Sequence, residues 1–326
     1  MDKGCPSIAW GQHLWLRTHL VYDDAHMSYG PLLIFIAAIL WGLDGILRRS
    51  LFTLPPITIV FFEHLIGAII IAPFLYRAWK SERLNTKEWQ ALGLVSLFSG
   101  VLGTLFFTTA LLKVNFIAFS VVFLIQKLQP IFAVAMGRLV LGEQVTRQYI
   151  AWAVLALVAG YFVTFPNGVV NLGEGGAYVT AALFALLAAV LWGSSTAFSR
   201  YVLLNHSNTF VTGMRFILTV PLALVAVFLL GANSSLSAVT PIQGLTLAGI
   251  AVSTGMLALW IYYRGLKTTP VRTSAIVELA FPMTAVLIDY FLYGTTLAFT
   301  QYLAAIVLLF AMYKVSQLQD QNVRTS

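Results

Sequence analysis

The sequence predicts an all-α integral membrane protein whose ten transmembrane helices form an inverted repeat of five plus five. Hydrophobic residues fill 59% of the 326 positions and charged residues only 10%, whereas soluble domains carry about 25% charged residues. Apolar runs of about 18 residues or more, enough to cross a hydrocarbon core about 30 Å thick, follow one another along the chain. Runs such as 177–191 are apolar on every side, which excludes the alternating strands of a β-barrel.

Each predicted span is an apolar run bounded by glycine, proline or charged residues. The expected spans are 31–50, 56–76, 89–111, 117–140, 147–165, 176–199, 208–230, 242–263, 272–293 and 298–315.

The two ends of the chain differ from these spans. Residues 1–28 are broken by charged side chains and contain no signal peptide. We expect a disordered N-terminal tail there, or a true start at Met27. Residues 29–170 and 171–316 are the predicted repeats, and 317–326 form a cytoplasmic tail.

Lysine and arginine residues predict the orientation. With ten spans, 14 of the 19 basic residues fall on the side of the termini, three on the other side, and two inside spans. This asymmetry places both termini in the cytoplasm.

The basic residues form no single patch, so no nucleic-acid partner is expected. Cys5 is the only cysteine, and the sequence predicts neither a metal nor a cofactor.

The halves repeat each other in sequence. Leu40-Trp41-Gly42 recurs as Leu191-Trp192-Gly193, 151 residues later. Further pairs, each separated by 152 residues, are Gly103 and Gly255, Gln126 and Glu278, Pro130 and Pro282, and Gly142 and Gly294. Because each half has five spans, the second half must cross from the opposite side. Inverted repeats are found in many secondary transporters, with the substrate site near the midplane between the halves.

Several short motifs carry a resemblance to a known family. The Leu-Trp-Gly elements, Gln129-Pro130, Leu141-Gly142-Glu143 and Phe281-Pro282 resemble the EamA-like branch of the drug/metabolite transporter superfamily over residues 30–316. The resemblance implies movement of small metabolites, often amino acids or related compounds, across the cytoplasmic (inner) membrane of a bacterium. Thr295 departs from the pattern, since many relatives repeat there the Gly-Glu pair seen at Gly142-Glu143. If Glu143 helps to gate one side, the symmetry is incomplete.

Two charged residues lie near the predicted bilayer centre, where a charge costs at least about 2.5–3.5 kcal/mol. We expect Glu278 and Lys127 to face a central aqueous cavity. Glu278 would bind a proton or substrate, and Lys127 would be its counter-charge or bind an anionic group. The alternative is a buried ion pair that only sets helix register. Because the repeat aligns Glu278 with Gln126, we expect Gln126 and Gln129 to share its cavity wall, with Lys127 on the flank.

Prolines and tryptophans at matching positions extend this candidate site. Pro130 and Pro282 would free the carbonyls of Gln126 and Glu278 four residues earlier and form paired hinges, or static kinks for packing. Trp41 and Trp192 could stack against a substrate or pack within the bundle.

A second polar group is expected toward the outer side, formed by Asp44, Glu63 and His64. Asp44 and Arg48 have the spacing of a helical ion pair. Glu63 and His64 are adjacent, so we expect them not to line one cavity together. His64 could titrate near neutrality or be a hydrogen-bonded core residue.

Two further polar residues fall inside predicted spans. Arg215 is expected to pair with an acid or extend toward cytoplasmic phosphates, and Asp289 to be interfacial.

These features predict a secondary transporter for a small metabolite, with export favoured and proton coupling through Glu278. A facilitative uniporter or channel is the alternative. A membrane enzyme would need a motif such as GxSxG or HExxH, and a scaffold would need larger loops; neither is found. No Walker motif is found either, so we expect no ATP hydrolysis by this chain. Membrane lipid and protons are the other expected partners, and a homodimer is left open.

Overall fold

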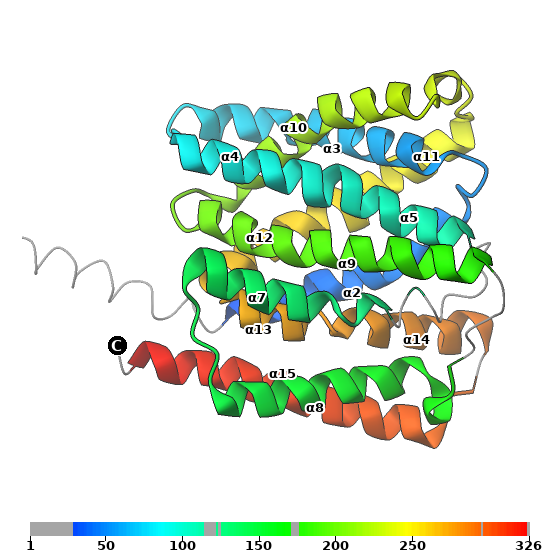
Figure 1. Ribbon diagram of the computed structural model, residues 1–326. Helices are drawn as coiled ribbons and strands as arrows, with labels where there is room; N and C mark the ends of the chain where they lie inside the picture. Colours follow the sequence, from blue (N-terminus) through cyan, green and yellow to red (C-terminus); the bar gives the residue numbers. More distant parts are fainter. Residues whose placement is uncertain (1–28, 114–121, 123–124, 171–175, 295, 325–326) are drawn as a thin grey trace, which may run out of the picture.

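The computed structural model describes residues 29–113, 122, 125–170, 176–294 and 296–324. The predicted N-terminal tail, Cys5 and Thr295 lie outside these residues. All regular elements in the described part are helices (Figure 1).

The helices of the two sequence halves follow similar orders. The first half contains α2 (Gly30–Arg49), α3 (Pro56–Trp79), α4 (Thr86–Val95), η2 (Ser96–Gly103), α5 (Thr104–Lys113), α7 (Gln129–Leu141), α8 (Arg147–Thr164) and η3 (Pro166–Gly168). The second half contains α9 (Gly176–Leu203), α10 (Asn208–Leu229), η4 (Asn233–Leu236), α11 (Pro241–Ile250), η5 (Ala251–Leu257), α12 (Ala258–Thr268), α13 (Val271–Val277), α14 (Ala280–Tyr293) and α15 (Phe299–Arg324).

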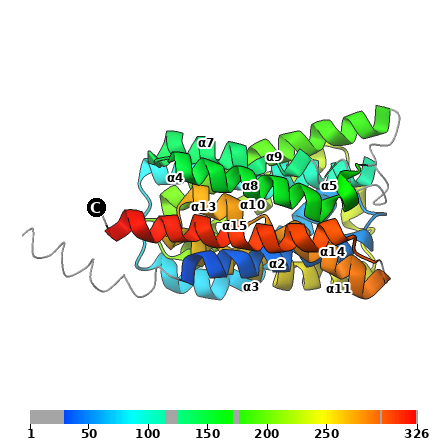
Figure 2. The same cartoon turned by 90° about the horizontal axis from the view of Figure 1, so that it is seen from below.

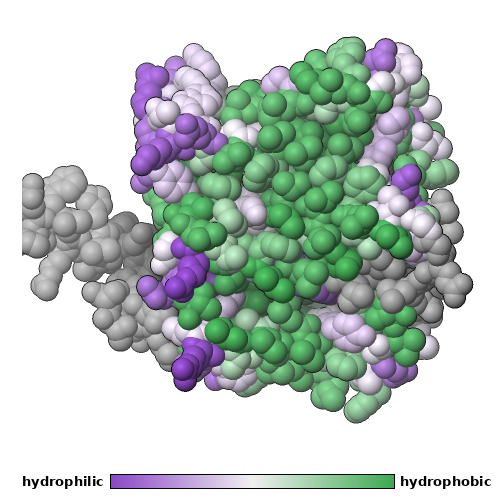
Figure 3. All heavy atoms as spheres, viewed as in Figure 1, coloured by the Kyte–Doolittle hydropathy of each residue, from purple (hydrophilic) through white to green (hydrophobic). Residues whose placement is uncertain are grey.

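Seven described helices are long and apolar enough to cross a membrane, and two shorter apolar helices accompany them. Hydrophobic side chains cover the visible face between two more hydrophilic ends (Figure 3). Large apolar residues such as Leu139 and Ile306 are more than 60% exposed on this surface, as expected for contact with lipid. The chain is therefore a multi-pass membrane protein. The count of ten spans and the inverted repeat remain predictions.

Helices from the two halves pack on each other in matched pairs. The helices α3 and α10 pack together, as do α8 and α15, which lie side by side at one edge of the bundle (Figures 1 and 2). Helix α2 packs against α12 and α14, while α9 packs against α5 and α7. The first helix of each half therefore lies against later helices of the other half, so the centre of the protein is built from both.

Gly193 and Gly42 permit two of these contacts. A Cβ on Gly193 would lie 2.7 Å from the backbone oxygen of Gln129, and one on Gly42 would lie 3.2 Å from that of Phe281. Both distances are shorter than normal carbon–oxygen contacts. Only glycine lets α9 and α2 approach these backbones so closely.

Candidate functional site

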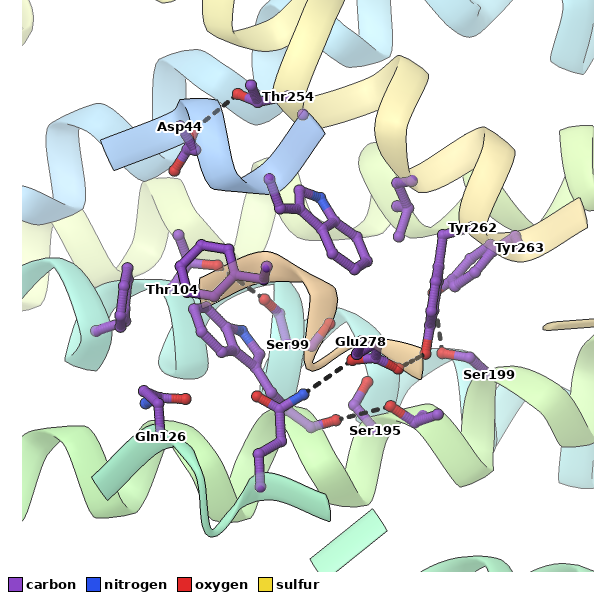
Figure 4. A pocket seen from close by; sticks show the side chains of 18 of the residues that line it. Asp44, Ser99, Thr104, Gln126, Ser195, Ser199, Thr254, Tyr262, Tyr263 and Glu278 are labelled. Atoms are coloured by element: carbon purple, nitrogen blue, oxygen red, sulfur yellow. Dashed lines mark hydrogen bonds between the residues drawn. The ribbon is translucent and has the colours of Figure 1, made fainter. Parts of the chain in front are cut away.

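A cavity of about 220 Å³ lies at the centre of the protein, lined by residues from both halves (Figure 4). The lining includes all six predicted binding residues: Trp41, Gln126, Lys127, Gln129, Trp192 and Glu278. It also includes Asp44, Glu63, His64 and Pro130. Pro282 is the third residue of α14, and its side chain lies outside the described part.

The backbone of each half is interrupted at this cavity. Helix α13 ends at Val277, and α14 begins only after Glu278 and Leu279. The residues before α7 show the same break at Lys127 and Leu128. At both breaks a backbone hydrogen bond joins residues that are three apart, not four as in an α-helix. Leu279 N donates to Ile276 O at 3.1 Å, and Leu128 N donates to Ile125 O at 3.0 Å. The two breaks therefore lie 151 residues apart, at Lys127 and Glu278, whereas Pro130 and Pro282 lie 152 apart.

The expected effect of the prolines is corrected. The backbone carbonyl of Glu278 is not free, because it accepts a 3.0 Å hydrogen bond from Phe281 N. Pro130 is the second residue of α7. Backbone N–H groups in the first turn of a helix have no acceptor within the helix, so a proline there removes no helical hydrogen bond. Pro130 therefore begins a helix after the break. Its role as a hinge remains a prediction.

The Glu278 carboxylate is held by neutral donors. Its Oε1 accepts from the Tyr262 hydroxyl at 2.6 Å and from Ser274 Oγ at 2.9 Å, and its Oε2 accepts from Gln129 Nε2 at 3.1 Å. No described lysine, arginine or histidine forms an ion pair with it. Hydroxyl and amide donors can hold an ionised carboxylate without fixing its charge as a cation would.

Lys127 lines the same cavity. Its side chain is buried, with only 9% of the residue exposed. Within the described residues it forms neither an ion pair nor a hydrogen bond, and hence is not the counter-charge of Glu278 there. A buried ammonium group without hydrogen bonds is costly, so Lys127 is suited to contact a polar group of a bound molecule.

The two glutamines have their amide groups oriented by protein acceptors. Gln126 Nε2 donates to Ala185 O at 2.8 Å, and Gln129 Nε2 donates to Glu278. Carbonyl and carboxylate oxygens only accept hydrogen bonds, so the nitrogen of each amide must face them. The amide oxygens face elsewhere, and Figure 4 shows the oxygen of Gln126 directed toward the cavity.

Aromatic pairs form two further parts of the lining. Trp41 lies 5.0 Å from Tyr262 between ring centroids, and Trp192 lies 5.0 Å from Phe107. Each pair joins one ring from the first half with one from the second. Such rings offer flat apolar surfaces on which a planar ligand can stack.

The outer polar group is an ion-paired network. Arg48 forms the predicted pair with Asp44 and also donates from Nη2 to Glu63 Oε2 at 2.6 Å. Asp44 accepts from Thr254 Oγ1 at 2.7 Å. Both carboxylates are therefore bound to a cation, unlike Glu278.

Two expectations about neighbouring residues are wrong. Glu63 and His64 both line the cavity, because its wall extends around enough of α3 to include adjacent positions. His64 Nδ1 lies 2.8 Å from Val60 O. Arg215 does not extend toward the membrane surface; it lines the cavity and donates to the Tyr263 hydroxyl at 3.1 Å.

Glu143 connects the halves beyond one end of the cavity. Its Oε1 accepts from Val271 N at 2.7 Å and from Arg200 Nη1 at 3.0 Å, and its Oε2 accepts from Arg272 N at 3.0 Å. The two amides are the first of α13, whose N-terminus favours a negative charge. Glu143 thus fixes the helix that leads to Glu278. The side chain of Asp289 lies outside the described part.

Sequence reasoning missed Tyr262, Ser274 and Ser195. Hydroxyl side chains are common in apolar helices, and nothing in their spacing distinguishes these three. Across the described residues, no group of three or more histidine, cysteine or acidic side chains could hold a metal ion.

Comparisons with known proteins identify the family. The model of the EamA-like transporter family matches the chain twice, over residues 28–165 and 179–317. The riboflavin transporter ImpX of Fusobacterium nucleatum subsp. nucleatum is 36% identical over 301 residues, which cover 90% of this chain and 99% of that protein. A protein known from a crystal structure shares the fold, with a TM-score of 0.70, 20% identity, and coverage of 89% of this chain and 98% of its own. The chain belongs to the EamA-like transporter family.

Proposed function

We propose that this membrane transporter carries riboflavin, or a flavin of similar size, through the central cavity by alternating access. The single observation that carries the substrate is the 36% identity with the riboflavin transporter ImpX along nearly its whole length. The aromatic pairs around Trp41 and Trp192 support it, since a flavin has a large planar ring.

Riboflavin replaces the amino acid expected from the sequence. That expectation came from the family resemblance, and an amino acid, as a zwitterion, would need free partners of both charges. In the structure Asp44 and Glu63 both bind Arg48, so these two carboxylates are already neutralised within the protein. Besides Lys127, Glu278 and Arg215, the lining offers amides, hydroxyls and aromatic rings, and these groups suit a heteroaromatic compound.

The proposed topology has ten spans as an inverted repeat, with both termini in the cytoplasm of a bacterium. The matched packing of α3 with α10 and of α8 with α15 supports a two-fold relation between the halves. The distribution of basic residues supports the orientation. Export, a homodimer and specific lipid contacts remain predictions.

We further propose that Glu278 carries the coupling proton. Its three donors are neutral, so it can lose or gain a proton without leaving a buried cation unpaired, whereas Glu63 cannot. Acidic side chains inside membrane segments often belong to the proton relays of pumps and transporters.

Transport of radiolabelled riboflavin into proteoliposomes tests the proposed function. Uptake above protein-free vesicles, competed by unlabelled riboflavin but not by tryptophan, is expected. Absence of riboflavin movement in both net uptake and counterflow, with or without a pH gradient of either direction, would overturn it.

A further inference from the structure

We propose that Gln126, Lys127, Gln129 and Ser195 form a subsite that binds the imide edge of a flavin ring, where one N–H lies between two carbonyl groups. This inference rests on the proposed function and assigns one part of the substrate to one wall of the cavity.

Several polar groups of the cavity are already paired within the protein. Asp44 and Glu63 both bind Arg48, and Glu278 is occupied by its three donors. Arg48 Nη1 and Arg215 Nε have no partner within the described residues, but they belong to α2 and α10. Among the described residues, no group donates to the amide oxygens of Gln126 and Gln129.

Two donors on this wall are also free. Ser195 Oγ is buried and has no hydrogen-bond partner within the described part of the chain. The side chain of Lys127 is buried too, and it forms no hydrogen bond or ion pair with another described residue. Buried polar groups are rarely left unpaired. A bound molecule that satisfied them would recover the cost of their desolvation.

The four residues belong to two elements in direct contact. Gln126, Lys127 and Gln129 lie at the break before α7 or at its start, and Ser195 lies on α9. Gly193 brings α9 against the backbone of α7. Figure 4 shows Gln126 and Ser195 along the same wall of the cavity.

The free groups match the imide edge in kind. An imide N–H needs an acceptor, which the glutamine oxygens provide, and its two carbonyls need donors, which Lys127 and Ser195 provide. The orientation of both amides is fixed by their bonds to Ala185 O and Glu278, so the acceptors are prepared before the ligand binds. Trp192, on the same helix as Ser195, offers an adjacent ring surface.

Binding of riboflavin and of 3-methylriboflavin to the purified full chain in nanodiscs tests the proposal. The methyl group replaces the imide hydrogen and leaves the ring otherwise unchanged. A site that hydrogen-bonds this hydrogen should bind the methylated compound at least about tenfold more weakly. The double variant Gln126→Leu/Gln129→Leu should reduce that preference to less than about twofold, because the acceptors are gone. Gln90→Leu, at an exposed position on α4, is the matched control and should keep it.

The outcomes separate this proposal from the proposed function. If the wild-type chain binds neither compound, the proposed function fails. If it binds both equally, or if the folded double variant keeps the wild-type preference, riboflavin transport stands and the subsite is overturned. The comparison of the two ligands on the wild-type chain still tests the subsite if the double variant does not fold, because equal binding would overturn it.

Discussion

The break at Lys127 and the break at Glu278 share their backbone geometry and differ in charge. Each interrupts a helix for two residues and resumes it one or two residues before a proline. One carries a lysine without a partner among the described residues, and the other carries a glutamate with three neutral donors. The first position of the break is therefore a lysine in one half and a glutamate in the other.

We propose that the first break recognises the substrate and the second couples its movement to protons. Variants at the two breaks should then have different effects, and four predictions follow in order of decreasing size.

Glu278→Gln should have the largest effect, on transport driven by a pH gradient. The amide can hydrogen-bond but cannot carry a proton on and off, so accumulation of riboflavin should fall to the level of protein-free vesicles. Counterflow, which needs no net proton movement, should continue. Loss of counterflow together with accumulation in a well-folded variant would show instead that Glu278 binds the substrate.

Lys127→Met should weaken riboflavin binding about tenfold, which corresponds to about 1.4 kcal/mol. It should also raise the melting temperature of the substrate-free protein by a few degrees, because a buried ammonium group is removed. Binding titrations and thermal unfolding in nanodiscs measure the two effects. A fall in melting temperature would mean that Lys127 has a stabilising partner.

Tyr262→Phe removes the 2.6 Å hydrogen bond to Glu278. A hydrogen bond to a charged group contributes about 1.5–3 kcal/mol, so we expect gradient-driven accumulation to fall about tenfold. Tyr263→Phe is the control, since its hydroxyl bonds Ser199 and Arg215. Equal losses in the two variants would remove the specific link to Glu278.

Glu143→Gln should have the smallest effect on binding, because Glu143 lies outside the cavity lining. Riboflavin affinity should stay within about twofold of the wild type. The melting temperature should fall by a few degrees as the bond with Arg200 and the anchoring of α13 weaken. Gln144→Ala, at an exposed neighbour, is the control. An unchanged melting temperature would contradict the anchoring role.

Charge in apolar segments made much of the site predictable. Lys127 and Glu278 stand out because charges in membrane helices are costly, and the glutamines and tryptophans follow from the repeat. Tyr262, Ser274 and Ser195 could not be found, because their importance comes from helices that meet only in the fold.

The exact correspondence of the breaks was also beyond the sequence. Pro130 and Gly142 match Pro282 and Gly294 at a spacing of 152 residues, but α14 is one residue longer than α7. The prolines and glycines stay aligned while the breaks shift by one, and only the backbone hydrogen bonds show the shift. For Glu63 and His64, the sequence could indicate the angle between neighbours but not how far the cavity extends around α3.

The most direct test of the central claim is an experimental structure of the protein with riboflavin bound. The account predicts density for the flavin ring in the central cavity, beside the breaks at Lys127 and Glu278 and against Trp41 or Trp192. Density at any other place, with the cavity unoccupied at saturating riboflavin, would contradict it.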